Sequence, residues 1–234
     1  MSSSQLKIIA IITMLIDHVG IVLDFFDHKY LQIVFRLIGR ISFPLFAFLL
    51  TQGHQHTKNK KRYIKRIFIF ALVSHIPYQL FRLLYDINVY NNNIFFTLLF
   101  SLIIFEFYDK LVTKSNTREK SFYFLLMTIL LIISEILKFE YGCLGLLLSL
   151  SFKKNFLENL SIRNNYFFLP TIILLFIYPL TSIESFLFLL FSLISLIIIS
   201  KYNNKLGHSF KYISYLFYPL HLIILCLFRK KIFS

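Results

Sequence analysis

Residues 6–25 read LKIIAIITMLIDHVGIVLDF. This run is about as long as a helix must be to cross a bilayer, roughly 20 residues. It nevertheless contains Lys7, Asp17 and His18, which hydrocarbon excludes unless something nearby uses them. Lys7 and His18 are 11 positions apart. That is roughly three helical turns, so both lie on one face about 16 Å apart along the axis. The spacing predicts Lys7 at a membrane surface and His18 near the middle of the bilayer.

Two interpretations of this segment remain open. A cation at the rim and an imidazole at mid-membrane suit a reaction that starts in water and finishes inside the membrane. Alternatively, Asp17 and His18 pair with a neighbouring helix and only hold a bundle together. The residues of the first segment do not decide between catalysis and structure.

The composition identifies the class of protein. Of 234 residues, 57% are hydrophobic and 15% are charged, and the mean hydropathy is +0.71. Soluble domains are about 45–50% apolar and about 25% charged, so we expect an all-α, polytopic integral membrane bundle. The net charge of +14 comes from cations in short loops between apolar runs. This pattern favours membrane topology and contact with anionic lipids or phosphates over nucleic-acid binding.

Nine apolar segments predict about nine transmembrane helices in a single domain covering residues 1–234. They are residues 6–25, 31–52, 64–84, 94–112, 121–137, 139–152, 166–180, 184–200 and 212–228. The loop at 53–63 is the most basic, which places it and the N-terminus in the cytoplasm. Alternation then places the loops at 110–120, 153–163 and 201–211 inside as well. The cations at 229–231 break this pattern.

The second segment carries a possible partner for the first. Arg36 and Arg40 are four residues apart, hence on one helix face. If the two segments run antiparallel, Arg40 reaches the depth of Asp17, and an Asp17–Arg40 pair allows both charges in lipid. Pro44 is expected to kink this helix.

Further candidates are polar residues at the cytoplasmic surface and in later segments. His54 and His56 form a His-x-His pair, but no carboxylate or thiol accompanies them in sequence, so we expect no metal. The cations from Lys58 to Arg66 are a topology signal or a docking patch for a phosphate-rich cofactor. His75 precedes Pro77 at an expected helix break. The remaining candidates are Asn93, Tyr218 and His221.

Together these stretches resemble the TraX family of polytopic membrane proteins. The resemblance rests on MLIDH at 14–18, IGRISFPLFAFLL at 38–50, IPY at 76–78, IFFTLL at 94–99 and FYPLHL at 217–222. It covers most of the chain. The family's named activity is N-terminal acetylation of conjugative pilin. His75 departs from the family pattern, which usually has an acidic or amide residue there, and Glu140 stands where aspartate is expected.

The TraX family is in turn similar to the membrane acyltransferase-3 superfamily, which moves acyl groups from cytoplasmic acyl-CoA to acceptors across the membrane. That superfamily has a basic residue, ten spacers and a histidine in its first helix, and Lys7 and His18 reproduce this spacing. Arg62 and Arg66 loosely resemble its cytoplasmic arginines, and Tyr215–His221 resembles its closing segment.

These resemblances imply an acetyl-CoA-dependent acyltransferase of a bacterial inner (plasma) membrane. Its expected partners are an unknown peptide or glycan acceptor and membrane lipids. The implied catalytic residues are His18 as base or acyl carrier, with Asp17 and Arg40. The expected cofactor-binding residues are Lys7, Arg36, His56, Arg62, Lys65 and Arg66. The expected substrate residues are His75, Asn93, Tyr218 and His221. The alternative is a non-enzymatic channel, transporter, or secretion or conjugation assembly component.

Overall fold

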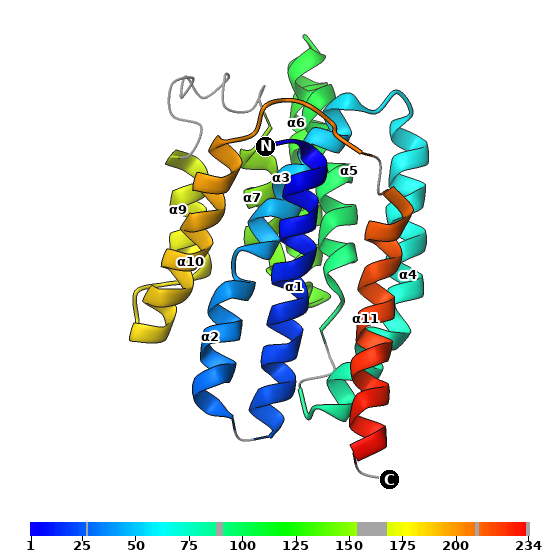
Figure 1. Ribbon diagram of the computed structural model, residues 1–234. Coiled ribbons are helices and arrows are strands. Elements are labelled where there is room, and N and C mark those ends of the chain that lie inside the picture. Colours follow the sequence, from blue (N-terminus) through cyan, green and yellow to red (C-terminus); the bar gives the residue numbers. More distant parts are fainter. Residues whose placement is uncertain (27, 88–90, 154–167, 209–210, 233–234) are drawn as a thin grey trace. The chain divides into compact units, whose positions relative to one another are not determined.

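The computed structural model describes residues 1–26, 28–87, 91–153, 168–208 and 211–232 (Figure 1). These residues form α-helices and no β-strands. The helices are α1 (Ser3–Phe25), α2 (Lys29–Gly39), α3 (Ser42–His56), α4 (Lys60–Leu84), α5 (Ile94–Thr113), α6 (Thr117–Ile136), α7 (Gly142–Ser151), α9 (Phe168–Ile177), α10 (Ile183–Ser200) and α11 (Lys211–Ile232). The predicted all-α fold is confirmed.

The helices have the length and composition of a membrane bundle. Among the described residues, the stretches long and apolar enough to cross a bilayer are Ser3–Leu23, Lys29–His56, Lys60–Leu84 and Ile183–Ser200. Gly142–Ser151, which is α7, and Ser214–Arg229, which lies within α11, are shorter apolar stretches. Each of the predicted segments contains a described helix. Of the predicted basic loop at 153–163, all but its first residue lies outside the described residues, as do 209–210 of the loop at 201–211.

Two proline predictions need correction. The second predicted segment is two helices, because α2 ends at Gly39 and α3 begins at Ser42. The break precedes Pro44, which lies in the first turn of α3, where a missing N–H costs no helical hydrogen bond. Conversely, α4 continues through Pro77, so the helix break expected there is wrong. A membrane helix tolerates an internal proline when neighbouring groups satisfy the freed carbonyl.

The chain divides into two compact units. Unit 1 contains residues 1–49, 73–89 and 174–234, and unit 2 contains residues 50–72 and 90–173. Both α3 and α4 contribute residues to each unit. The prediction of a single domain stays a prediction.

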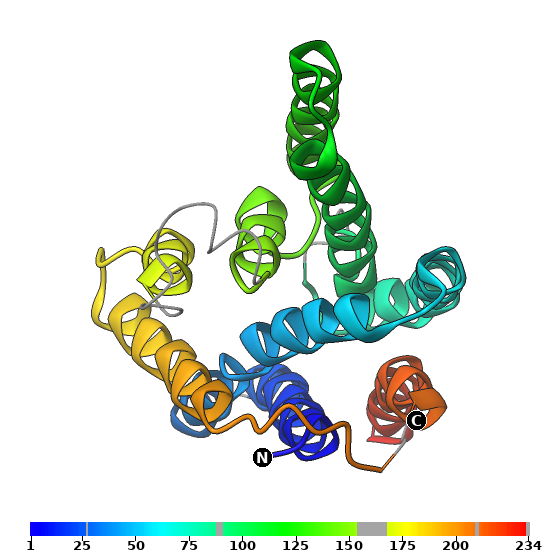
Figure 2. The same ribbon diagram turned by 90° about the horizontal axis from the view of Figure 1, so that it is seen from above.

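In unit 1, α1 packs against α2 and α11, and α10 packs against α2. Helices α1 and α2 form an antiparallel hairpin joined by a short turn, as predicted, and lie side by side in both views (Figures 1 and 2). The first N–H groups of a helix lack partners within the helix. Here Ser3 N donates to Lys205 O at 2.8 Å and Ser4 N to Leu206 O at 3.1 Å. The loop after α10 therefore fixes the start of α1.

In unit 2, α5 packs against α6 and α7. Asn93 starts α5 as its N-cap, and its Oδ1 accepts from Phe95 N at 3.0 Å. Its Nδ2 donates to Ala71 O in α4 at 2.9 Å. Asn93 is fully buried, so its amide joins two helices of this unit as well as capping one.

Gly39 permits the close approach of α2 to α1. A Cβ atom built at Gly39 would overlap the carboxylate of Asp17. The helix there could otherwise accept alanine, which favours helices over glycine by about 1 kcal/mol. Overpacking typically costs about 1–3 kcal/mol, so the clash outweighs the gain in propensity.

We therefore expect Gly39→Ala to lower the free energy of unfolding by up to about 2 kcal/mol despite its better helix propensity. Thermal unfolding in detergent, followed by circular dichroism, measures the effect. Val34→Ala on the exposed face of α2 is the control and should change stability little. A Gly39→Ala protein more stable than the wild type would contradict the packing described.

Candidate functional site

Asp17 of α1 binds two arginines: Arg36 in the last turn of α2 and Arg40 directly after that helix. Arg36 Nη1 donates to Asp17 Oδ2 at 2.8 Å, and Arg40 Nη2 donates to Asp17 Oδ1 at 2.5 Å. The three side chains are only 11–25% exposed. The predicted Asp17–Arg40 pair is confirmed. Arg36, which was assigned to a cofactor, binds the same carboxylate.

Arg40 joins three helices. Besides Asp17, its Nε donates to Arg36 O at 3.1 Å. Its guanidinium also lies 5.2 Å from the ring centre of Phe188 in α10. These contacts fix the guanidinium beside Asp17. The catalytic role that the family resemblance implies for Arg40 stays a prediction.

His18 is oriented by its own helix. Its Nδ1 lies 2.9 Å from Met14 O, one turn earlier. A carbonyl oxygen only accepts hydrogen bonds, so Nδ1 carries the proton and Nε2 of the neutral ring carries the lone pair. Neighbouring residues of a helix point about 100° apart, and Asp17 is bound to the arginines. Met14 O therefore orients the imidazole, and Asp17 does not.

Aromatic rings from two other helices surround His18. Ring centres lie 5.6 Å away at Phe81 in α4, 6.2 Å at Tyr218 and 4.8 Å at His221, both in α11. These neighbours are 1%, 3% and 4% exposed. Two predicted substrate residues, Tyr218 and His221, thus lie together with His18 in unit 1. We call these four residues the histidine cluster.

His221 repeats the geometry of His18. Its Nδ1 lies 2.8 Å from Phe217 O, so its Nε2 also carries the lone pair. This Nε2 is buried and has no hydrogen-bond partner among the described residues. Buried polar groups in proteins are almost always paired, so this acceptor calls for an explanation.

The other predicted substrate residues lie elsewhere. His75 is half-buried on α4 in unit 1. Asn93 is the buried cap of α5 in unit 2, with both ends of its amide engaged. The structure therefore explains Asn93 as a capping residue. Lys7 lies in the second turn of α1, on the same uninterrupted helix as His18.

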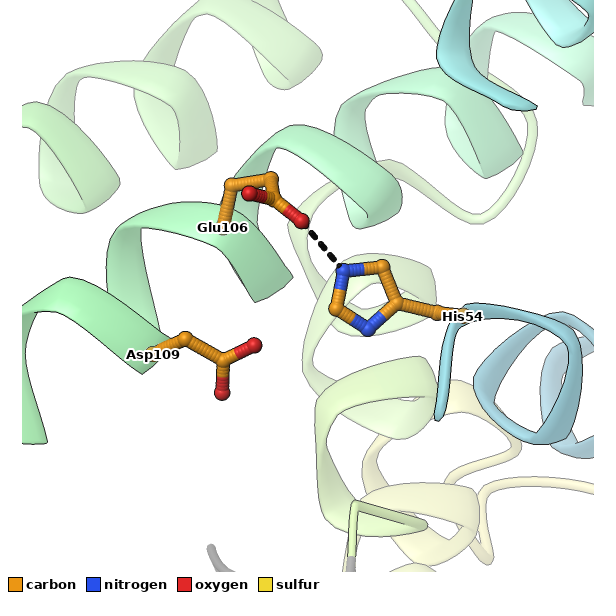
Figure 3. A group of neighbouring side chains, drawn as sticks. All are labelled: His54, Glu106 and Asp109. Atoms are coloured by element: carbon orange, nitrogen blue, oxygen red, sulfur yellow. Dashed lines mark hydrogen bonds and ion pairs between the residues drawn. The ribbon is translucent and has the colours of Figure 1, made fainter. Parts of the chain in front are cut away.

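A second cluster, which the sequence did not predict, lies in unit 2. His54 Nε2 of α3 is 2.7 Å from Glu106 Oε1 of α5, and Asp109 lies one turn further along α5 (Figure 3). Their ligand atoms lie within 4.8 Å of one another, so the group could hold a metal ion. His54 is 1% exposed, whereas His56 is exposed. The two histidines therefore do not act as a pair.

Two lysines balance the acids of this cluster. Lys60 Nζ lies 3.3 Å from Glu106 Oε1 and 3.0 Å from Asp109 Oδ2, and Lys153 Nζ binds Asp109 Oδ1. Burial lowers the pKa of Lys153, and the hydrogen bond to Asp109 opposes that shift. Two ammonium groups thus offset two carboxylates. We interpret the cluster as an ion-pair network that ties α3, α4, α5 and the end of α7 together.

The basic run at the start of α4 divides into two groups. Lys60 is engaged in the network, and Arg66 lies over the Tyr63 ring at 5.0 Å. The exposed cations are Lys58, Lys61, Arg62 and Lys65. Asn59 Oδ1 accepts from Arg62 N at 2.8 Å and caps the helix.

Comparisons with known proteins find a matching family model and a partial relative. A family model described as TraX protein matches residues 2–229. A relative in Dichelobacter nodosus, named "Probable fimbrial assembly protein FimC, serogroup H1", is 30% identical over 110 residues. That match covers 44% of this chain and 44% of the relative, less than half of either. No solved structure matches the chain.

The paired arginines predict an order of stability. Asp17→Asn leaves two guanidinium groups without their anion, whereas Arg36→Gln leaves Asp17 bound to Arg40. Breaking a fully buried pair costs about 3–5 kcal/mol. Because these side chains are partly exposed, we expect about 2 kcal/mol for Asp17→Asn and less than about 1 kcal/mol for Arg36→Gln. Thermal unfolding in detergent compares them, and equal or reversed losses would refute the two-arginine arrangement.

Proposed function

The chain belongs to the TraX family, and on that premise we propose that it is a membrane-embedded acyltransferase. The proposed donor is acetyl-CoA. The proposed acceptor is a peptide N-terminus, such as that of a pilin, or a surface glycan or polymer. The name of the fimbrial relative supports a role connected with pili.

The proposal depends mainly on the fixed orientation and tautomer of the His18 ring. With Nδ1 donating to Met14 O, the neutral ring must present its basic nitrogen, Nε2, on the side away from its own backbone. Acyl transfer needs such a nitrogen, either to remove a proton from the nucleophile or to carry the acyl group. Aromatic neighbours keep the ring in a largely apolar environment.

The proposed reaction is transfer from a thioester. The acceptor amine or hydroxyl attacks the thioester carbonyl carbon, the new C–N or C–O bond forms, and the C–S bond breaks. Nε2 of His18 takes the proton of the acceptor and returns it to the CoA thiolate. In the alternative route, Nε2 itself attacks the thioester carbonyl carbon as the C–S bond breaks. The acceptor then attacks that carbonyl carbon, the bond between Nε2 and carbon breaks, and the proton of the acceptor passes to the thiolate. We assign to Arg40 the stabilisation of the negative charge that develops on the carbonyl oxygen during the attack.

The exposed cations of the basic run are the proposed docking site for the phosphates of CoA. Lys58, Lys61, Arg62 and Lys65 are exposed, and they lie close together in sequence around the first turns of α4. Arginine offers planar bidentate contacts to phosphate, and lysine offers a mobile point charge. Anionic lipid headgroups would use the same charges.

A second candidate function is a non-enzymatic component of a pilus or conjugation assembly. The name of the Dichelobacter nodosus relative favours it, because that protein is described by assembly and not by an activity. This candidate has no need for acetyl-CoA. Binding of the donor therefore separates the two functions.

Removing the base tests the enzymatic proposal. General acid–base catalysis contributes about 10²- to 10⁴-fold, so His18→Ala should lower acetyl transfer from labelled acetyl-CoA by at least about 100-fold. His28→Ala is the matched control, because His28 is an exposed histidine in the turn before α2. Both proteins should insert and unfold alike. Full transfer by His18→Ala would exclude His18 as base or carrier.

Charge removal tests the docking site. The triple change Lys61→Ala, Arg62→Ala and Lys65→Ala should weaken CoA binding at least tenfold, because phosphate contacts are lost. Isothermal titration in neutral detergent measures it without competing anionic lipid. The triple change Lys114→Ala, Arg118→Ala and Lys120→Ala removes as many exposed cations around the start of α6 and serves as the control. A wild-type protein indifferent to CoA would favour the assembly component.

A further inference from the structure

His221 does more than pack against His18. The two rings meet edge to face with centres 4.8 Å apart, from α1 and α11 of unit 1. No hydrogen bond joins the two rings in the structure, but the separation is short enough for a small rotation of the rings to bring a nitrogen of one within hydrogen-bond distance of a nitrogen of the other. Each ring is held by a carbonyl of its own helix, Met14 O and Phe217 O.

The tautomers of the two rings prevent a hydrogen bond between their Nε2 atoms in the neutral state. Both Nδ1 atoms donate to carbonyls, so in the neutral state both Nε2 atoms are acceptors and neither can donate to the other. His221 is 4% exposed, and its Nε2 has no partner among the described residues. A single added proton changes this, because an imidazolium at His18 donates from Nε2 and the buried acceptor on His221 is satisfied.

We propose that His221 is the proton partner of His18: the proton that His18 takes during transfer is held in an Nε2–H···Nε2 hydrogen bond between the two rings. This inference rests on the proposed function and assigns His18 the role of base. The interaction exists only after the proton has left the acceptor, so it stabilises the reacting state more than the resting state. His221 is a positioning residue, since it acts through His18.

The proton balance of the step is complete. The acceptor nucleophile bonds to the acetyl carbon, its proton moves to Nε2 of His18, and the C–S bond breaks to release the thiolate. The shared proton then passes from the histidine pair to the thiolate, which leaves as CoA thiol. Both histidines return to the neutral Nδ1–H form.

Two substitutions separate this role from packing. In His221→Asn the amide nitrogen takes the place of Nδ1 and keeps the bond to Phe217 O, but nothing replaces Nε2. We expect kcat to fall about 100-fold with the KM for acetyl-CoA unchanged, as for loss of a proton-transfer group. His221→Gln puts an amide oxygen near the position of Nε2 and should recover at least tenfold of that loss.

Ile224→Ala on the exposed face of α11 is the control and should retain wild-type kcat. A purely structural role predicts that Asn, which keeps the backbone contact, is at least as active as Gln. Wild-type kcat in His221→Asn, or Asn as active as Gln, would overturn the proposal.

A measurement on the unmodified protein does not depend on activity. In protein labelled with ¹⁵N-histidine and titrated with acid, we expect scalar coupling across the hydrogen bond between Nε2 of His18 and Nε2 of His221. Protonation of the two rings without that coupling would refute the pairing, whatever the protein transfers. If the coupling is present but no acetyl transfer occurs, the proposed function fails and the shared proton stands.

Discussion

The ion pair of Asp17 with Arg36 and Arg40 is the interaction on which unit 1 depends. A carboxylate in an apolar helix is costly unless it is paired, and here both oxygens are paired by guanidinium groups from the adjacent chain segment. The pairing fixes the register of α1 against α2, and Gly39 gives the carboxylate the space it occupies. His18 follows Asp17 directly and therefore points to a different side of α1. On that side it contacts the other residues of the histidine cluster.

The histidine cluster of unit 1 and the cluster around His54 in unit 2 differ in whether their polar groups have hydrogen-bond partners. In unit 2, two lysines offset the charges of Glu106 and Asp109, and His54 Nε2 lies 2.7 Å from Glu106, which accounts for the group as structural. In unit 1, His221 keeps a buried acceptor without a partner among the described residues. A buried polar group without a partner calls for a specific explanation, and a catalytic role is one of them. This difference favours unit 1 as the functional site.

The sequence predicted the helices and the first ion pair because both depend on local spacing. Long apolar runs mark the helices, and an arginine at the depth of Asp17 follows from an antiparallel hairpin. The sequence did not show that Arg36 also binds Asp17, because one arginine of the i, i+4 pair is enough to balance the carboxylate. It missed the contact of His18 with His221 and the bond of His54 to Glu106, because each joins segments far apart in the chain. Glu106 and Asp109, three residues apart in an apolar run, were the available signal for the second cluster.

The central proposal is that the half-buried imidazole of His18 is the group through which an acetyl moiety passes to an acceptor. Mass spectrometry of surface peptides and polymers tests this most directly, in cells that carry the gene, lack it, or carry it with His18→Ala. The account predicts an acetyl-sized mass difference on at least one surface molecule, present only with the wild-type gene. Identical acetylation in all three strains would contradict it.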